Sequence, residues 1–308
     1  MTSTIAPFQD AAGWERALYA FLAEKERRSG SRRTVEGYSR MLQHFFDTLA
    51  KPPDRVTSQE VFAWAYGRGL SGKEPSPVTI GARLACLSSF YRFLIRMEIV
   101  TSNPCDQIQR PRTSLSPPRG LSAEEIRRLL SVIPDTPTGL RDRAIILTLT
   151  LTGRRRSEVL NLKAGDISQA GGLFYTYRGK GGKQAKRELA RPAFEAIQTA
   201  LAAFGKDLST MAPDEAPWPS SANNGRGVTS GTFYCNLRRY LRRAGLPPAG
   251  VHILRHSAAK LRRDAGESVE DVSRFLDHSS LAGPTVSLRR LEGQEDRSWG
   301  KVAEAIGV

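Results

Sequence analysis

Two histidines and an arginine lie close together in the segment VHILRH, residues 251–256. His252, Arg255 and His256 are spaced i, i+3 and i+4, so in a helix their side chains share one face. A guanidinium and an imidazole on one face suit a phosphate group, because arginine can hold phosphate oxygens through two parallel hydrogen bonds. The spacing therefore favours phosphate chemistry.

Two other interpretations of this segment stay open. Histidines at i and i+4 can bind zinc, but zinc proteases carry glutamate after the first histidine, and Ile253 stands there. The segment could also be an ordinary solvated helix face.

The three cysteines, Cys86, Cys105 and Cys235, are far apart and in no Cys-x-x-Cys arrangement, so they predict neither a disulfide framework nor a zinc site. We expect all three to be reduced and structural.

The charge of the chain points to a polyanionic partner. Lys and Arg total 46 against 31 Asp and Glu in 308 residues, which gives a net charge of +15 and a pI near 10.2. Such an excess favours nucleic acid, with an anionic membrane surface as the competing partner. No apolar run approaches the length of a spanning helix, and residues 1–18 lack the pattern of a signal peptide. We expect a cytoplasmic protein that has no membrane partner.

The elements that must position these residues begin with four amphipathic helices in the first hundred residues. Apolar side chains recur at helical spacing in each. Capping signals predict where three of them begin: Ser31, Thr57 with Glu60, and Ser76 with Pro77. The region predicts a small helical bundle.

Basic side chains gather around two helix ends of this bundle: Arg27, Arg28, Arg32, Arg33, Arg83 and Arg92. A surface that faces DNA and a merely solvated basic surface are both compatible with this pattern. Residues 106–119 follow, polar and rich in proline and arginine, and they predict an extended linker. The predicted domains are therefore residues 10–105 and 120–308.

The second domain is predicted to mix helices with a strand pair. A glycine-rich turn holding Lys180 joins the strands, although a solvated turn lysine is the commoner fate of such a residue. Gly153 interrupts one helix immediately before three arginines. The expected helices span residues 122–133, 140–151, 192–204, 231–243 and 268–276 with one more around His252, and the strands span 173–178 and 184–190. The four arginines of the 231–243 helix look like a solvated face.

Taken together, TGRRRSE, RGKGGK, HILRH and DHSS, in this order and at these separations, resemble the motifs of the tyrosine recombinase (phage integrase) family. The family's T-G-x-R-x-S-E pattern places its first site arginine at Arg155, with Glu158 behind it. The hairpin lysine carries over to Lys180. The H-x-x-R pair and the later His or Trp carry over to His252, Arg255 and His278.

The resemblance implies an N-terminal helical core-binding (SAM-like) bundle and a C-terminal α+β catalytic domain. It also implies a DNA strand transferase that closes around double-stranded DNA, works without metal or other cofactor, and is a monomer in solution and a homo-tetramer on paired sites. The expected DNA contacts are Arg32, Arg33, Arg83, Arg92, Arg112 and Lys183.

The implied chemistry is physically coherent. A phosphodiester in a pentacoordinate transition state needs fixed cations at its non-bridging oxygens, which Arg155 and Arg255 would supply. His252 and His278 would donate hydrogen bonds to those oxygens or manage the nucleophile's proton. Lys180 would protonate the departing 5′ oxygen.

The sequence departs from the family at the nucleophile. The family's tyrosine lies nine residues after the last His or Trp, and from His278 that count reaches Ser287. No tyrosine follows Tyr240 in the chain. A serine alkoxide leaves far less readily than a phenolate, whose parent phenol ionises near pKa 10. We therefore expect an intact site that has lost strand cleavage.

Two rival functions remain. A DNA-binding accessory protein could use the same fold to occupy or organise a site without cutting, although a pure binder has no need for the four motifs together. A basic helical protein on a membrane surface or on RNA would leave the motifs as coincidence.

The tail, residues 291–308, carries an apolar helical face of Trp299, Val302, Ala303 and Ile306. This face can pack on its own domain or on a neighbour's, and the resemblance favours the neighbour.

Overall fold

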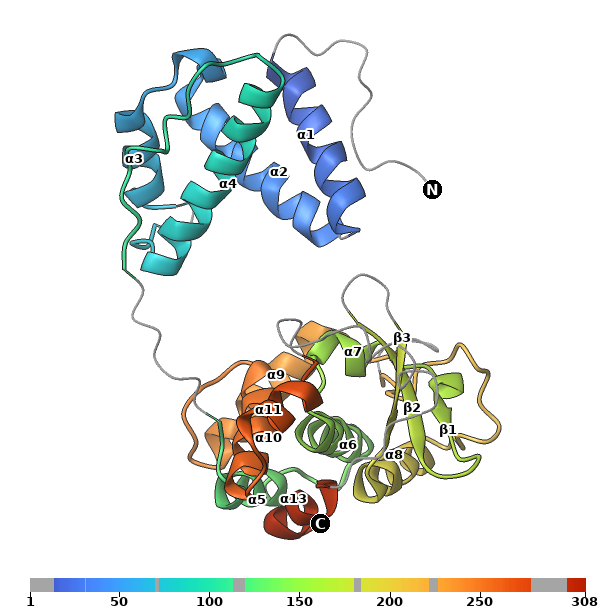
Figure 1. The fold of residues 1–308 in the computed structure, drawn as a ribbon. Helices are drawn as coiled ribbons and strands as arrows, with labels where there is room; N and C mark the ends of the chain where they lie inside the picture. Colours follow the sequence, from blue (N-terminus) through green and yellow to red (C-terminus); the bar gives the residue numbers. More distant parts are fainter. Residues whose placement is uncertain are drawn as a thin grey trace. The chain divides into compact units, whose positions relative to one another are not determined.

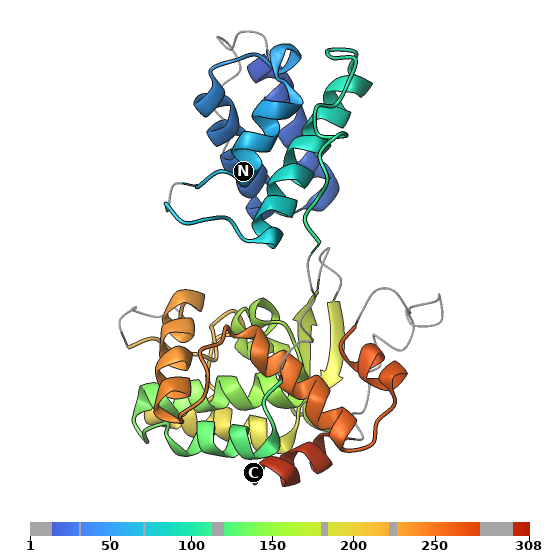
Figure 2. The ribbon, with the colours of Figure 1, turned by 90° about the vertical axis from the view of Figure 1, so that its left-hand side faces the viewer.

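The computed structural model describes residues 14–30, 32–69, 72–112, 120–179, 184–221, 227–277 and 298–308. The chain divides into two compact units, residues 1–116 and 117–308. Helices dominate both units, and the second also contains a three-stranded sheet (Figures 1 and 2). The predicted fold class, mainly α with a small β-sheet, is confirmed. The predicted linker is described only as far as residue 112, so its bounds stay a prediction.

The first unit is a bundle of helices that begin where the sequence signals predict. Thr57 and Glu60 form the expected capping box before one helix, and the Ser76 hydroxyl accepts from the Thr79 amide at 3.2 Å before another. The predicted cap Ser31 lies outside the described residues. The elements are α1 (Trp14–Ser29), α2 (Arg32–Leu49), the short 3-10 helix η2 (Pro53–Arg55), α3 (Ser58–Tyr66) and α4 (Pro77–Arg96).

Aromatic side chains fill the core of this bundle. The rings of Phe21 and Phe46 both meet Phe90 edge to face, with centroids 5.3 Å and 5.8 Å apart. Such pairs add to the stabilisation from apolar burial alone. The four helices therefore share one apolar core, to which α1, α2 and α4 each contribute a ring.

Helix α4 corrects one sequence expectation. The helix is 20 residues long, and an 18-residue stretch of it has a mean hydropathy of 1.3, so by length and composition it could cross a membrane. Half of that stretch is buried inside the unit. Leu84, Leu87 and Phe90, three residues apart, are buried on its inner face. The bundle core accounts for the apolar character of this helix.

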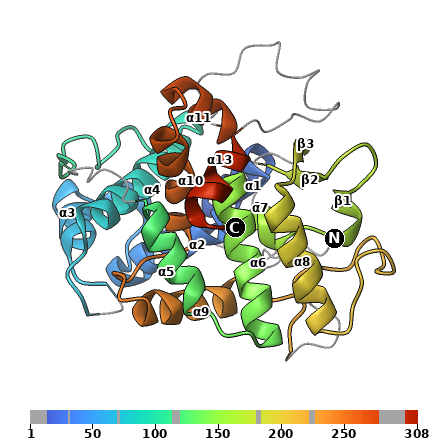
Figure 3. The same cartoon turned by 90° about the horizontal axis from the view of Figure 1, so that it is seen from below.

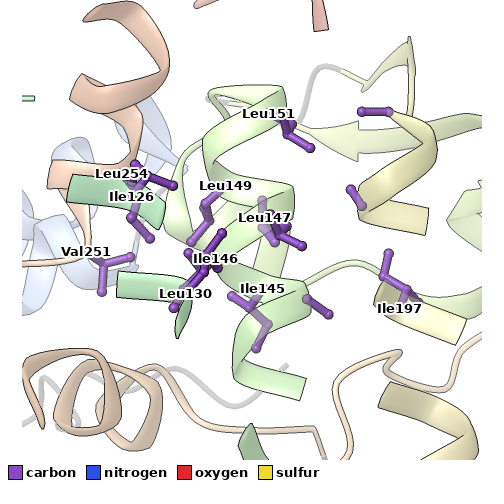
Figure 4. Close-up of a cluster of buried hydrophobic side chains, with 14 of the residues drawn as sticks. Ile126, Leu130, Ile145, Ile146, Leu147, Leu149, Leu151, Ile197, Val251 and Leu254 are labelled. Atoms are coloured by element: carbon purple, nitrogen blue, oxygen red, sulfur yellow. The ribbon is translucent and has the colours of Figure 1, made fainter. Parts of the chain in front are cut away.

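The second unit is built around one buried helix, α6. Its side chains are apolar or hydroxyl-bearing almost all round, which is the pattern of a helix surrounded by protein. Figure 4 shows Ile146 and Leu149 of α6 among Leu130 and Leu254 of neighbouring elements. The helices are α5 (Ala123–Ser131), α6 (Pro137–Thr152), α7 (Arg156–Leu160), η3 (Ala164–Asp166), α8 (Arg191–Ala203), α9 (Ser230–Arg243), α10 (His252–Asp264), α11 (Val269–Phe275) and α13 (Trp299–Ile306).

The sheet has the antiparallel order β1-β2-β3, with β1 at Ile167–Ser168, β2 at Phe174–Arg178 and β3 at Gln184–Glu188. Tyr175 and Tyr177 of β2 alternate with more exposed residues and point into the core. The sequence predicted β2 and β3 but missed β1, because two residues are too few to show alternation.

The tail helix α13 packs on its own unit. Val302, Ala303 and Ile306 are 1–3% exposed and lie against α5 and α6, as Figure 3 shows for the red helix. The Trp299 indole donates to the Glu188 carboxylate at 3.0 Å. The predicted apolar face is thus present, and in this single chain it takes the first of the two expected locations, the chain's own domain.

Candidate functional site

The turn after α6 sets the first arginine of the site. Gly153 ends α6 in the left-handed region, at φ 61°, and a Cβ there would lie 2.5 Å from the Phe275 ring. Glycine is therefore needed both for conformation and for space. The tight turn lets α7 begin at once and places Arg155 at its N-cap.

Glu158 holds Arg155 in place. Its two carboxylate oxygens accept from the Arg155 backbone amide and from the Arg155 guanidinium, both at 2.8 Å. The Glu158 side chain is 3% exposed, whereas the Arg155 side chain is 38% exposed. Glu158 thus holds the Arg155 side chain in position, while the Arg155 guanidinium remains accessible to solvent.

Arg255, one turn into α10, is buried by comparison. It is 7% exposed, and its guanidinium donates to the carbonyl oxygens of Gly153 and Leu276, both at 2.6 Å. Burial, and repulsion from Arg155 and Arg154, lower the pKa of Arg255 to about 10. The guanidinium remains charged at neutral pH, and Arg155 lies close enough to it to contribute to that repulsion.

The two histidines of α10 are exposed. The rings of His252 and His256 have centroids 6.4 Å apart. They border a shallow hollow of about 300 Å³ that Leu121 and Ile253 also line. Burial, His252 and Arg255 lower the pKa of His256, which keeps this ring neutral at physiological pH. Within the described ranges no three His, Cys, Asp or Glu side chains gather as a metal site.

Several predicted site residues lie outside the described residues: Lys180, Lys183, His278 and Ser287. Their assignments stay predictions. The described neighbours on either side are strands β2 and β3 for the hairpin lysines, and Asp277 for His278.

Asp277 belongs to a group of polar and charged residues that the sequence did not single out. Its carboxylate accepts from Arg154, from the Tyr177 hydroxyl and, at 2.9 Å, from Arg187. We call Arg154, Tyr177, Arg187 and Asp277 the Asp277 cluster. In the sequence Arg154 is one of three adjacent arginines, and nothing in their spacing marks it as the buried one.

Five of the residues predicted to contact DNA lie in the first unit and the start of the linker. Four of them are exposed, and the side chain of the fifth is hydrogen-bonded to the protein backbone. Arg33, Arg92 and Arg112 are exposed, and the exposed Arg32 pairs with Glu36. Arg83 instead donates through one nitrogen to the carbonyls of Trp64, Ala65 and Gly67 at 2.8–3.0 Å. Those carbonyls end α3, so Arg83 acts as a helix cap and only its remaining N–H groups are free for another ligand.

Helix α9 presents a basic face. Arg238, Arg239 and Arg242 line a hollow of about 560 Å³ together with Tyr234 and Cys235. Cys235 is exposed, so the expectation that all three cysteines are structural is wrong for it; Cys86 and Cys105 are buried. The four arginines of this helix were expected to be solvated, and they are exposed, but three of them share one hollow.

The inner face of α9 is fixed by a buried ion pair. Asp142 accepts from Arg141 at 2.7 Å, and its other oxygen accepts from Asn236 at 2.8 Å and Tyr240 at 3.0 Å. Asn236 and Tyr240 belong to α9, whereas Asp142 belongs to α6. The basic face is therefore carried on a helix that hydrogen bonds hold to the central helix of the unit.

Comparisons with known proteins agree with this architecture. The sequence model of the phage integrase family matches residues 119–284, and that of the phage integrase N-terminal SAM-like domain matches residues 17–98. The tyrosine recombinase XerC of Syntrophus aciditrophicus (strain SB) is 33% identical over 245 residues, which are 77% of this chain and 79% of that protein. XerC of Pelobacter propionicus is 31% identical over 286 residues, 89% and 91% of the two proteins.

Solved structures share the fold. A lambda integrase dimer bound to a COC′ core site has a TM-score of 0.66 at 18% identity, over 86% of this chain and 95% of that one. The XerH recombinase in a post-cleavage complex with palindromic difH has a TM-score of 0.66 at 20% identity, over 88% and 79%. The family match and the XerC relatives together show that this chain belongs to the phage integrase, or tyrosine recombinase, family of site-specific DNA recombinases.

Proposed function

We propose that this chain is a site-specific DNA recombinase or integrase whose phosphate-binding site is intact and whose strand cleavage is lost because Ser287 replaces the nucleophilic tyrosine. The observation that carries the first half is the link between the two arginines at the Gly153 turn: Arg255 binds the Gly153 carbonyl, and Arg155 follows that turn as the N-cap of α7. The Arg255 pKa, lowered to about 10 by burial and by Arg155 and Arg154, supports it. Cations held close together repel one another, and a bound phosphate would relieve that repulsion.

Each of the remaining groups has a role in this proposal. Arg155 and Arg255 neutralise the non-bridging oxygens of the scissile phosphate. His252 and His278 donate hydrogen bonds to those oxygens or handle the nucleophile's proton, and Lys180 protonates the departing 5′ oxygen. The family's reaction, breaking and rejoining DNA through a 3′-phosphotyrosine, needs a phenol at position 287.

The DNA-binding surface in this proposal combines both units. Arg32, Arg33, Arg92 and Arg112 contribute from the first unit and the start of the linker, and Lys183 and the basic face of α9 from the second. The net charge of +15 supports a polyanionic partner in the cytoplasm. Arg83 enters the proposal with fewer free donors, because it caps α3.

Affinity for duplex DNA is expected to fall steeply with salt, because each neutralised phosphate releases counterions. For six to ten phosphate contacts the loss is about 10³- to 10⁵-fold between about 50 and 200 mM salt, which a gel-shift series measures. Arg242→Gln on α9 should lower the salt slope by about one unit. Lys206→Gln, whose charge already pairs with Glu215, should leave the slope unchanged. Binding that does not vary with salt would exclude DNA as the partner.

We further propose a monomer in solution and a homo-tetramer on paired sites, with α13 moving onto a neighbour in the assembly. Deleting residues 298–308 should abolish the larger DNA complexes in native gels while binding of a single subunit survives. Because Val302 and Ile306 are buried, the truncated protein should also melt at a lower temperature. Lys301→Ala, an exposed change on the same helix, is the control. Large complexes that persist after truncation would refute this role for the tail.

One specific observation favours the second candidate, a non-cleaving accessory protein: no tyrosine follows Tyr240 in the sequence. Such a protein would bind and organise a recombination site without chemistry. The two candidates separate on Ser287→Tyr, because only a retained catalytic site can turn an added phenol into covalent product.

A further inference from the structure

We infer that the Asp277 cluster positions the turn of residues 275–277, after which His278 follows in the sequence, and, through Arg255, the arginines proposed to bind phosphate. Arg154, Arg187 and Asp277 are in this view positioning residues for cleavage. The inference rests on the proposed function, since it concerns the geometry of that same site.

Arg154 cannot itself bind the substrate phosphate. It is 1% exposed, and all three guanidinium nitrogens are used: one donates to the Thr152 carbonyl at 3.1 Å, one to the Tyr177 hydroxyl at 2.6 Å and to Asp277, and one to the Phe275 carbonyl. A buried arginine with every nitrogen engaged fixes its neighbours rather than a ligand.

Asp277 adopts a backbone conformation that is costly for a residue with a side chain. Its φ is 51°, in the left-handed region. Three donors from two other parts of the unit, Arg154 after α6 and Tyr177 and Arg187 on the sheet, hold the carboxylate there. Burial alone would raise the pKa of Asp277, but Arg154, Tyr177 and Arg187 lower it overall, so the carboxylate is ionised at neutral pH. A strained residue that its surroundings hold so firmly is a mark of functional geometry.

Three consecutive residues at the end of α11 are each bound by an arginine. Arg154 binds the Phe275 carbonyl, Arg255 binds the Leu276 carbonyl, and Arg154 and Arg187 bind the Asp277 carboxylate. Arg255 also binds the Gly153 carbonyl, immediately before Arg154.

The contacts therefore form a closed ring. It joins the turn of Gly153 and Arg154, the turn of residues 275–277, and α10. Arg155 follows the first turn in sequence, Arg255 lies on α10, and His278 follows the second turn. A displacement of Asp277 would therefore move the backbone next to Arg155 and the carbonyl that Arg255 binds. It would also move the residue to which His278 is joined in the sequence.

The test compares Asp277→Asn with a matched control on α11, the helix that ends immediately before the turn of Asp277. Asparagine keeps the size of aspartate but loses the charge that three donors share. Arg274→Gln removes an exposed side-chain ion pair with Asp271 on α11 and leaves in place the backbone hydrogen bond from the Asp277 amide to the Arg274 carbonyl. In a Ser287→Tyr background, single-turnover cleavage of a suicide DNA site should fall about a hundredfold in Asp277→Asn, as expected for a displacement of about 1 Å, with little change in DNA affinity. Arg274→Gln should cleave like its parent.

A double-mutant cycle separates positioning from a general loss of structure. If Asp277 acts through His278, adding Asp277→Asn to His278→Ala should cost little beyond His278→Ala alone. If Asp277 is only structural, the two losses should multiply, and the inference fails. Arg187→Gln, which removes one of the three donors, should show a smaller loss of the same kind and serves if Asp277→Asn does not fold.

Hydrogen exchange gives a readout that does not depend on cleavage. In the present serine form, backbone amides of residues 272–277 should exchange faster in Asp277→Asn and not in Arg274→Gln. Unchanged exchange would overturn the inference whether or not the tyrosine form cleaves. A Ser287→Tyr parent that forms no covalent complex would instead count against the proposed function.

Discussion

Ser287→Tyr is expected to give this chain covalent strand cleavage, with a 3′-phosphotyrosine link and a free 5′ hydroxyl, and with no requirement for magnesium. The position follows from the count of nine residues after His278 and from the absence of any tyrosine after Tyr240. The residue itself lies outside the described part of the structure. Of the predicted site residues, Arg155, His252 and Arg255 are described, and Arg155 lies close enough to Arg255 to lower its pKa.

The physical reason is the chemistry of the attacking oxygen. A phenol ionises near pKa 10, so phenolate can attack, remain attached and be expelled when the strand rejoins. Serine is a poorer leaving group and a shorter side chain, and a nucleophile misplaced by about 1 Å can cost on the order of a hundredfold. Gly283-Pro284 is predicted to start the helix that carries position 287, so it sets the direction of the phenol and hence the rate.

The measurement is a detergent-resistant protein-DNA band on a nicked or suicide site. Ser287→Phe is the matched control, because it adds the ring without the hydroxyl and should give no band. A band from the present serine form that maps to Ser287 would contradict the loss of the nucleophile. No band from the tyrosine form on its proper site would mean that more than position 287 has changed.

The sequence predicts those elements of the fold whose signals lie within a few neighbouring residues. The capping boxes at Thr57 and Ser122 are set by residues three apart, and both are present. Strand β1, only two residues long, forms through its pairing with β2, so no local pattern announces it. Helix starts were therefore predictable from the sequence, and this strand was not.

For the site, the sequence supplied residue types but not burial. Arg154 and Arg155 are adjacent and chemically identical, yet one is 1% exposed and binds Asp277, while the other reaches solvent and pairs with Glu158. Their difference is set by the direction of the chain after Gly153 and by contacts more than a hundred residues away. Asp277 gave no signal because its partners lie far from it in the sequence, Arg154 in the turn after α6 and Tyr177 and Arg187 on the sheet.

Arg155 and Arg255, which are proposed to bind phosphate and which look equivalent in the sequence, differ in burial: Arg155 is 38% exposed and Arg255 is 7% exposed. In a Ser287→Tyr background, Arg155→Ala and Arg255→Ala should each lower the cleavage rate about a hundredfold to a thousandfold, because each removes a fixed cation from the transition state. DNA affinity should fall only modestly in both. From the sequence alone we would also expect neither substitution to lower the stability of the fold, because a cation reserved for a ligand contributes little to a core.

The structure keeps that expectation for Arg155 and changes it for Arg255. Arg155→Ala leaves Glu158 with its bond to the backbone amide, so the melting temperature should stay near that of the parent. Arg255→Ala leaves the buried carbonyls of Gly153 and Leu276 without their donor, at a cost of about 1–3 kcal/mol each. Thermal melts of the two variants beside Lys260→Ala, an exposed change on α10, measure the difference. Equal melting temperatures for Arg155→Ala and Arg255→Ala would mean that the Arg255 hydrogen bonds do not stabilise the turn at Leu276, and a large drop for Arg155→Ala would make that residue a structural ion pair instead.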